Sequence, residues 1–255
     1  MGTTVRTGEK GTPGTLASWW RSRYGRQLLI ERMVADYNYT HPGNYVRVEF
    51  KGSYRDTLNA AVLAAQQGNA PHLVQIFEIG SQLALDSGIF VPIEDYVVGP
   101  EFQADDYIEG VANYYKIGGK FNSMPWNSSN PILYYNKDMF RAAGLDPEAP
   151  PETFGEMLDA CEQIVSSGTA NNCISWPLHT WFFEQWMATM GADLANNGNG
   201  RDARATEVYL TSDAAKTIVN WWKEMSEKGY YAYSGKLEDW DGSDAIFVSG
   251  QAAME

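Results

Sequence analysis

The sequence is poor in basic residues and has no long apolar run. Its 255 residues contain 19 Lys and Arg against 32 Asp and Glu, which gives a formal net charge of −13. A surface that binds nucleic acid or an anionic membrane needs clustered Lys and Arg, so this deficit argues against both partners. The sequence also lacks the ~18 consecutive apolar residues of a membrane span.

Motifs of common catalytic and cofactor sites are also missing. There is no phosphate-binding G-x-x-x-x-G-K-[ST], no dinucleotide fingerprint, no H-E-x-x-H and no G-x-S-x-G elbow. The histidines His41, His72 and His179 are scattered, as is typical of surface or edge residues. The run 239–244 resembles a calcium loop but has Asp244 where that loop needs Gly, so we expect a solvated turn. We therefore predict no catalytic residue, no metal and no cofactor.

Cysteine is scarce, with only Cys161 and Cys173. Cys161 falls on the apolar face of a predicted helix, beside residues such as Phe154 and Ile164. We expect two buried thiols, because pairing cannot be deduced from sequence. A disulfide across this separation is the alternative in an oxidising compartment.

Aromatic residues are abundant, at 9 Trp, 15 Tyr and 10 Phe. They gather in two clusters, which comprise Trp176, Trp181, Phe182, Phe183 and Trp186 in one and Tyr230, Tyr231 and Tyr233 in the other. Aromatic faces next to carboxylates suit sugars and polyols, whose C–H faces stack while their hydroxyls form hydrogen bonds. Core packing is the alternative, and it is the role expected of Trp222.

The hydrophobic pattern alternates between strands and helices, which predicts an α/β fold with a largely parallel sheet. Ser53 and Asp56 have the spacing of a capping box at a helix start, and a Gly-Gly pair at 118–119 predicts a hairpin. The expected strands are 45–50, 72–77, 131–136 and 174–178. Because the alternation begins again after residue 130, we predict two α/β lobes, 19–130 and 131–255. A disordered or non-native tail, 1–18, is expected before them.

Glu78 is the carboxylate with the most suggestive position. It ends an apolar strand and directly precedes a helix start at Gly80 and Ser81. Ligands bind at this carboxyl edge in open α/β sheets, where a carboxylate can accept hydrogen bonds from hydroxyl groups. The alternative is that Glu78 only caps its own helix.

Several segments resemble the extracellular solute-binding proteins of carbohydrate-uptake ABC transporters (family 1). The matching residues are Tyr54–Leu58, Gly68–His72, Gln75–Gly80, Asn127–Phe140, Ala143–Asp146, Pro151–Phe154, Ala232–Lys236 and Phe247–Met254. Within the family the resemblance is greatest to the sn-glycerol-3-phosphate-binding component. It covers roughly residues 20–255, except for a poorly matched stretch around 176–206.

The resemblance implies a type II, maltose-binding-like periplasmic binding fold in which two lobes close on a ligand and deliver it to membrane permease subunits. The fold would be incomplete here, because the family has a further C-terminal part that returns to the first lobe. A monomer in the periplasm or at the cell surface is expected, and no enzyme. The ligand would be glycerol-3-phosphate, a glycerophosphodiester or a sugar.

The family's ligand contacts fall on Tyr54, Glu78 and Ser129 in this sequence. The resemblance also implies that tryptophans of the 176–186 cluster stack on the ligand, and we select Trp176 and Trp181. Tyr233 of the second aromatic cluster is the sixth candidate. One serine contact of the family falls on Ala232, which has no hydroxyl group. This departure and the net negative charge both argue against an anionic ligand. Two alternatives stay open: a glycan-active hydrolase that uses Glu78 and a second carboxylate, and a ligand-binding sensor that is not coupled to transport.

Overall fold

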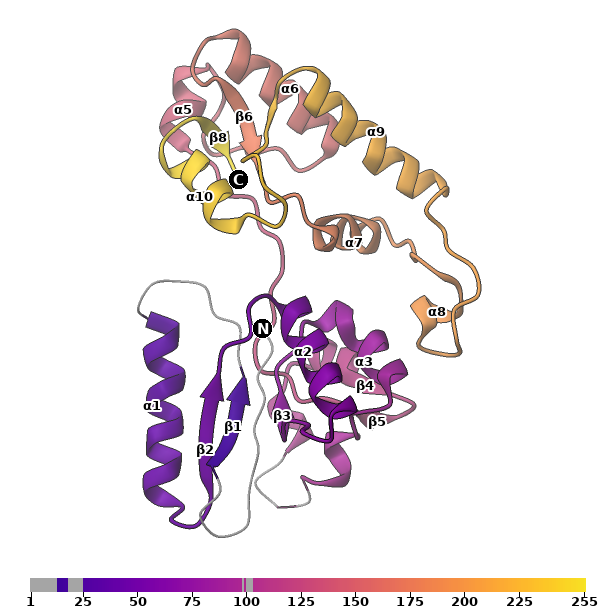
Figure 1. Ribbon diagram of the computed structural model, residues 1–255. Helices are drawn as coiled ribbons and strands as arrows, with labels where there is room; N and C mark the ends of the chain where they lie inside the picture. Colours follow the sequence, from indigo (N-terminus) through magenta and orange to yellow (C-terminus); the bar gives the residue numbers. More distant parts are fainter. Residues whose placement is uncertain (1–12, 18–24, 98, 100–102) are drawn as a thin grey trace. The chain divides into compact units, whose positions relative to one another are not determined.

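The chain forms two compact units, Met1–Ser128 (unit 1) and Ser129–Glu255 (unit 2). The computed structural model describes residues 13–17, 25–97, 99 and 103–255 (Figure 1). The division lies two residues before the lobe boundary expected from the sequence pattern. Each unit contains its own three-stranded parallel sheet, with strands joined by helices.

The sheet of unit 1 has the order β2-β1-β3. Its strands are β1 (Pro13–Ala17), β2 (Tyr45–Glu49) and β3 (Leu73–Val74). Its helices are α1 (Gly25–Thr40), α2 (Tyr54–Gln66), α3 (Ser81–Ser87) and α4 (Glu109–Tyr115). Three 3₁₀ turns, η1 (Glu78–Gly80), η2 (Ile93–Asp95) and η3 (Ala104–Asp106), and a hairpin of β4 (Lys116–Ile117) and β5 (Lys120–Phe121) complete the unit.

The central strand of unit 1 corrects one expectation. The sequence predicted a tail over residues 1–18, but Pro13–Ala17 pairs with both β2 and β3. Backbone groups make the hydrogen bonds of a parallel pair, and proline is tolerated at the first residue of a strand. A segment that begins with Pro and is rich in Gly and Thr can therefore form a strand. Residues 1–12 and 18 lie outside the described residues.

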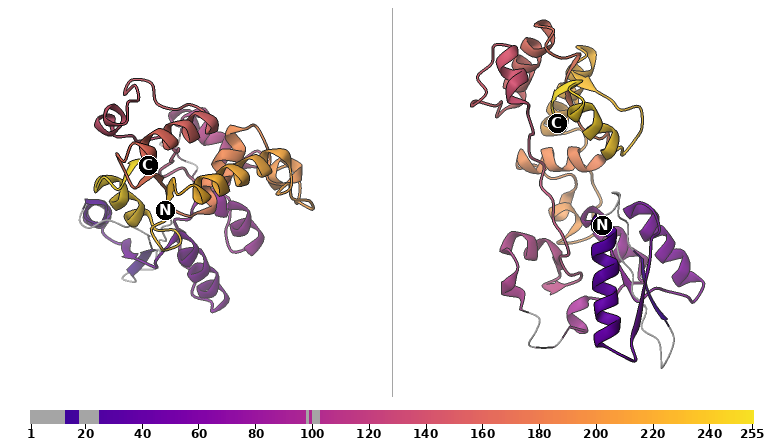
Figure 2. Two further views of the ribbon diagram at one scale, coloured as in Figure 1. Left: turned by 90° about the horizontal axis from the view of Figure 1, so that it is seen from above. Right: turned by 90° about the vertical axis from the view of Figure 1, so that its left-hand side faces the viewer.

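The elements of unit 1 are held by two small apolar clusters. Ile30 of α1 packs against Val46 of β2, and both figures show α1 running alongside that strand (Figures 1 and 2). Leu58 of α2 packs against Phe77 and Ala84. The start of α2 is fixed by a capping box between Ser53 and Asp56, as the sequence predicted, because each side chain bonds to the other residue's backbone N–H.

The sheet of unit 2 has the order β7-β6-β8. Its strands are β6 (Asn172–Ser175), β7 (Tyr231–Ala232) and β8 (Ala252–Met254). Its helices are α5 (Lys137–Ala142), α6 (Phe154–Ser166), α7 (Thr180–Thr189), α8 (Asn196–Gly200), α9 (Asp213–Glu227) and α10 (Trp240–Val248).

Two expectations in unit 2 need correction. The segment expected as a strand at 131–136 forms only an antiparallel bridge, in which the Tyr134 N–H donates to Glu255 O and the Asn136 N–H to Ala253 O, both at 2.9 Å. The supposed solvated turn at 239–244 is instead the start of α10. Gly242 permits this helix start, since a Cβ there would collide with the Asp239 carboxylate.

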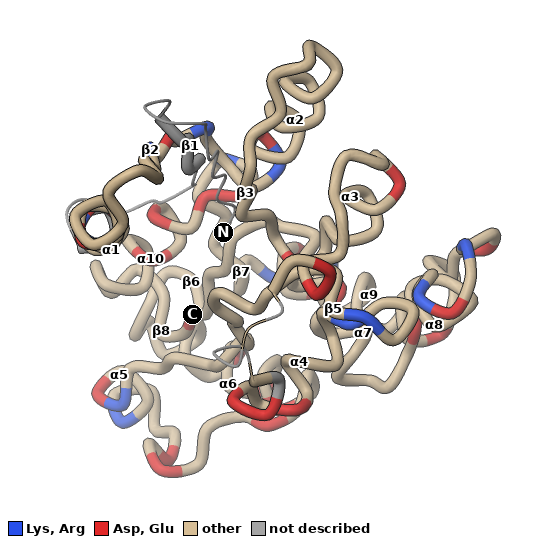
Figure 3. Tube along the Cα trace, turned by 90° about the horizontal axis from the view of Figure 1, so that it is seen from below, with Lys and Arg blue, Asp and Glu red and all other residues tan. Residues whose placement is uncertain are grey.

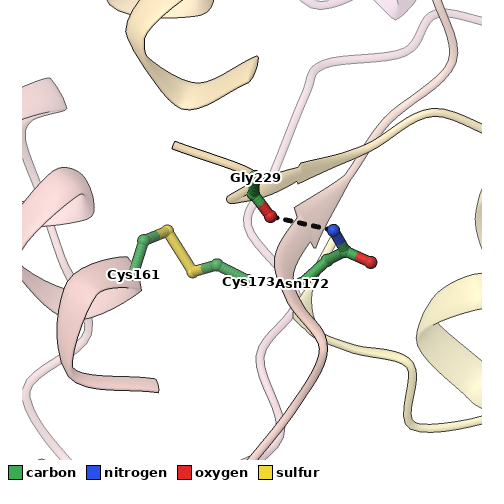
Figure 4. The surroundings of a disulfide bond; sticks show 4 residues. All are labelled: Cys161, Asn172, Cys173 and Gly229. Carbon is green, nitrogen blue, oxygen red and sulfur yellow. Dashed lines mark hydrogen bonds between the residues drawn. A yellow bond between two sulfur atoms is a disulfide. The ribbon is translucent and has the colours of Figure 1, made fainter. Parts of the chain in front are cut away.

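The two cysteines are joined, so the expectation of free thiols is wrong. Cys161 on α6 and Cys173 on β6 form a disulfide with a Cα–Cα distance of 5.0 Å, and both are fully buried (Figure 4). The chain turns back tightly after α6 and brings β6 beside the helix, which supplies the short distance that a disulfide requires. Asn172 next to it donates a hydrogen bond from Nδ2 to Gly229 O at 2.8 Å.

The core of unit 2 is dominated by aromatic side chains. Trp176 after β6, Trp221 on α9 and Phe140 on α5 are all at most 5% exposed. Trp222 packs against the same cluster, in agreement with the role expected of it. Among the helices that the structure describes, none has the length and apolar character needed to cross a membrane.

Candidate functional site

Two of the six candidate residues lie at the carboxyl edge of the unit 1 sheet. Tyr54 begins the helix that follows β2, and Glu78 begins the 3₁₀ turn that follows β3. Their elements meet there because the Tyr54 ring stacks on the Phe77 ring, with centroids 5.6 Å apart and planes inclined by 13°. This is the edge at which ligands bind in parallel α/β sheets.

Helix α4 brings two further tyrosines to Glu78. The Tyr114 hydroxyl donates to the Glu78 carbonyl oxygen at 3.2 Å. Burial raises the pKa of Tyr115 to about 12, and the negative charge of Glu78 and the neighbouring Tyr114 add to the effect. Sequence reasoning missed both tyrosines, although an adjacent aromatic pair near the end of a predicted helix was a usable signal. The arrangement offers a carboxylate and phenol hydroxyls in one place.

The carboxyl ends of β6 and β7 form the corresponding edge in unit 2. The two strands are parallel, and the chain continues their pairing through a bridge between Leu178 and Leu237. The Glu238 N–H donates to the Leu178 carbonyl oxygen at 3.2 Å. Candidate Trp181 and the residues that start α10 are therefore carried to the same edge of the sheet.

Trp181 is fixed by the residue that precedes its helix. His179 caps α7, and its Nδ1 accepts a hydrogen bond from the Trp181 N–H at 2.9 Å. The Trp181 ring meets Trp240 edge-on, with centroids 6.1 Å apart. Sequence reasoning missed both His179 and Trp240, because neither matches a motif and Trp240 stood in a segment taken as a turn.

Trp176 belongs to the core of unit 2. It is 4% exposed, with the Trp221 ring stacked on it at 5.4 Å and the Tyr231 ring tilted against it at 4.3 Å between ring centroids. The Tyr231 hydroxyl also donates to the Trp176 carbonyl oxygen at 2.8 Å. A ligand-stacking role for Trp176 does not agree with this packing, and we assign the residue to the core.

Ser129 and Tyr233 are accessible side chains of unit 2. Ser129 is exposed on the segment that precedes α5, and Tyr233 is 45% exposed directly after β7. Tyr233 lies close enough to Tyr231 to add to the rise in the Tyr231 pKa, which is caused first by burial. Ala232, where the family has a serine contact, is buried beside it.

The described residues contain no group of three or more His, Cys, Asp or Glu side chains that could hold a metal ion. Figure 3 shows Asp and Glu on many of the helices and Lys and Arg in fewer places. The edge of the unit 1 sheet presents tyrosine side chains and the Glu78 carboxylate, and the edge of the unit 2 sheet presents tryptophan rings and the Glu238 carboxylate. These groups can bind a hydroxyl-bearing molecule by hydrogen bonds and stacking.

The chain is similar to curated bacterial binding proteins over most of its length. It is 30% identical over 248 residues to the sn-glycerol-3-phosphate-binding periplasmic protein UgpB of Agrobacterium fabrum, covering 94% of this chain and 56% of that protein. It is also 30% identical over 247 residues to UgpB of Escherichia coli, covering 94% and 55%. The chain therefore spans about half the length of the curated relatives that it matches.

Solved structures show the same fold. UgpB from Mycobacterium tuberculosis in complex with glycerophosphocholine matches with a TM-score of 0.71 at 21% identity, covering 96% of this chain and 61% of that one. The sugar-binding protein MalE from Xanthomonas citri matches with a TM-score of 0.65 at 19% identity, covering 94% and 58%. The predicted α/β, maltose-binding-like fold is confirmed, and the chain covers part of it.

The family comparison agrees with both results. The family model described as "Bacterial extracellular solute-binding protein" matches residues 32–255, which is most of the chain. The two curated UgpB relatives and MalE are named as binding proteins. The chain therefore belongs to the bacterial extracellular solute-binding proteins.

Proposed function

We propose that the chain acts as the substrate-binding component of an ABC importer. It would capture glycerol-3-phosphate, a glycerophosphodiester or a sugar and deliver it to the permease subunits in the membrane. The observation that carries the proposal is the placement of Tyr54 and Glu78 together at the carboxyl edge of the unit 1 sheet. Family membership and the relatives named for glycerol-3-phosphate support it.

The chemistry of the two sheet edges supports a polyhydroxyl ligand. Glu78 can accept hydrogen bonds from neighbouring hydroxyls, and a charged acceptor strengthens such bonds. Tyr54 of unit 1 and Ser129, Trp181 and Tyr233 of unit 2 supply further hydroxyl and aromatic contacts. These residues are the ligand contacts that we propose.

The expected location is the periplasm or the cell surface, and we propose a monomer. The buried Cys161–Cys173 disulfide supports this location, since disulfides form and persist in oxidising compartments. Hydrolysis at Glu78 would need a second carboxylate placed across the scissile bond. A binding function needs no second carboxylate, and the relatives named as binding proteins support it.

Calorimetric titration with a ligand panel tests the proposal. The panel is sn-glycerol-3-phosphate, glycerophosphocholine, maltose and a galactobiose. We expect at least one to bind, and Glu78→Gln to weaken that ligand about 10- to 100-fold, since a hydrogen bond to a charged group contributes about 1.5–3 kcal/mol. Glu109→Gln, the same change at an exposed residue at the other end of α4, is the control.

Two results would contradict the proposal. A panel in which nothing binds the folded chain would argue against a solute-binding role for it. An affinity that Glu78→Gln leaves unchanged would remove Glu78 from the proposed contacts.

A further inference from the structure

Trp240 belongs to a small aromatic group at the margin of the core of unit 2, which it adjoins through Phe182. Its ring centroid lies 5.9 Å from that of His179, 6.1 Å from Trp181 and 5.5 Å from Phe182. The large core cluster contains Trp176, Trp186, Trp221 and Trp222 but neither Trp181 nor Trp240. Trp181 is 8% exposed and Trp240 is half-buried, so Trp240 offers the more accessible indole surface.

The backbone before Trp240 is held in an unusual conformation. Glu238 has φ +54°, in the left-handed region that a residue with a side chain seldom adopts. The turn follows directly on the bridge between Leu178 and Leu237, and it starts α10 at Trp240 beside α7. Strained backbone persists where the surrounding structure enforces it, and such residues cluster at ligand sites.

His179 connects the two tryptophan-bearing helices. Because its Nδ1 accepts from the Trp181 N–H, the neutral ring carries its proton on Nε2. This Nε2 lies 4.0 Å from Glu238 Oε1. The His179 side chain is 12% exposed and that of Glu238 45%, so the imidazole is fixed within the fold while the carboxylate reaches solvent.

The charge around Trp240 is strongly negative. Glu238, Asp239, Asp241 and Asp244 lie within seven residues of sequence, and the nearby cation Lys236 has its Nζ 3.9 Å from Asp239 Oδ1. A phosphate would be repelled by these carboxylates. An uncharged sugar ring would not be repelled, because its C–H face stacks on an indole and its hydroxyls donate to a carboxylate.

We propose that Trp240 and Glu238 form, with Trp181, a subsite of unit 2 that binds an uncharged sugar ring and sets the ligand preference of the chain. The ring stacks on Trp240, and Glu238 accepts hydrogen bonds from its hydroxyls. This inference rests on the proposed function and narrows its ligand class to neutral sugars over phosphorylated polyols.

The test compares four variants against the same four-ligand panel by calorimetry: two at Trp240, one at Glu238 and a control at Tyr39. Trp240→Leu removes the aromatic face and keeps an apolar side chain, whereas Trp240→Phe restores an aromatic face. Tyr39→Leu is the control, because Tyr39 is 88% exposed. It lies at the C-terminal end of α1, before β2, and so not at the carboxyl edge of the unit 1 sheet. Circular dichroism verifies that each variant is folded.

We expect maltose or the galactobiose to bind at least tenfold more tightly than either phosphate-bearing ligand. Trp240→Leu should weaken the sugar at least tenfold, Trp240→Phe should restore most of the affinity, and Tyr39→Leu should leave it unchanged. Glu238→Gln should also weaken the sugar.

Tighter binding of a phosphate-bearing ligand, or sugar affinity unaffected by Trp240→Leu, would overturn the subsite. In either case, a ligand whose affinity falls in the Glu78→Gln variant would still support the proposed function. Failure of the subsite can therefore be distinguished from failure of the proposed function. If none of the four ligands binds, both the subsite and the proposed function are contradicted.

Discussion

Loss of the Cys161–Cys173 bond is expected to lower the free energy of unfolding of unit 2 by about 2.8 kcal/mol. A disulfide stabilises a protein largely by limiting the conformations of the unfolded chain, and the effect grows with the length of the closed loop. The two cysteines are separated by 12 residues in sequence. For such a loop the entropy relation gives about 2.8 kcal/mol at 25 °C.

Alanine is the better replacement for both cysteines. Each is 0% exposed in the core of unit 2. A serine hydroxyl buried there without a partner would cost about 1–3 kcal/mol on its own and obscure the loop effect. The Cys161→Ala/Cys173→Ala double variant removes the bond without adding a buried polar group.

Urea unfolding followed by tryptophan fluorescence measures the effect. Six of the nine tryptophans belong to unit 2, so the fluorescence signal reports mainly on that unit. The double variant should unfold at lower urea, and dithiothreitol should lower the midpoint of the native chain similarly once unfolding exposes the bond. A change below about 1 kcal/mol in both cases would refute the argument that this loop closure stabilises unit 2.

Two further predictions concern unit 2. Burial and the neighbouring carboxylate of Asp244 raise the pKa of Glu255 from 4.5 to about 7. The folded state therefore binds the Glu255 proton more tightly than the unfolded state does. The resulting contribution to the free energy of unfolding is complete below pH 4.5 and is lost as the pH rises through 7. Asp244→Asn should reduce this loss in thermal unfolding at pH 5 and pH 8, and an unchanged pH dependence would contradict it. Phe140→Ala should lower the free energy of unfolding by about 3–5 kcal/mol, because the ring is 1% exposed and packs on Tyr135; a urea midpoint like that of the native chain would refute this.

Local signals predicted much of each unit. The Ser53 and Asp56 spacing predicted the start of α2, because a capping box is a contact between residues three positions apart. The Gly118–Gly119 pair predicted the β4–β5 hairpin, in which both glycines have positive φ. Features of this kind depend on neighbours in sequence, so the sequence pattern was sufficient.

The features that sequence reasoning missed depend on distant parts of the chain. Pro13–Ala17 is a central strand because β2 and β3 flank it, which its own Gly- and Thr-rich composition does not indicate. The disulfide depends on how β6 returns beside α6. Trp240 gains its neighbours only through the parallel pairing of Leu178 with Leu237.

Some of the candidate site residues could be chosen from the sequence, whereas others could be assigned only from the structure. Glu78 and Tyr54 stay proposed contacts because they follow the two strands that flank β1. The cluster around Trp176 could not be sorted into core and surface by composition, because both roles favour aromatic residues. The contacts of Trp176 with the stacked Trp221 ring and the tilted Tyr231 ring assign Trp176 to the core.

The parallel pairing in unit 2 also bears on how quickly the chain acquires its structure. Asn172 of β6 pairs with Ala252 of β8, 80 positions later, and Ile174 pairs with Tyr231. Contacts so distant along the chain slow folding, because a long loop must close before the pairing is gained. During synthesis, β6 can complete its pairing with β8 only after Met254 has left the ribosome. A chain that stays partly unfolded through that interval is exposed to aggregation through its unpaired strand edges.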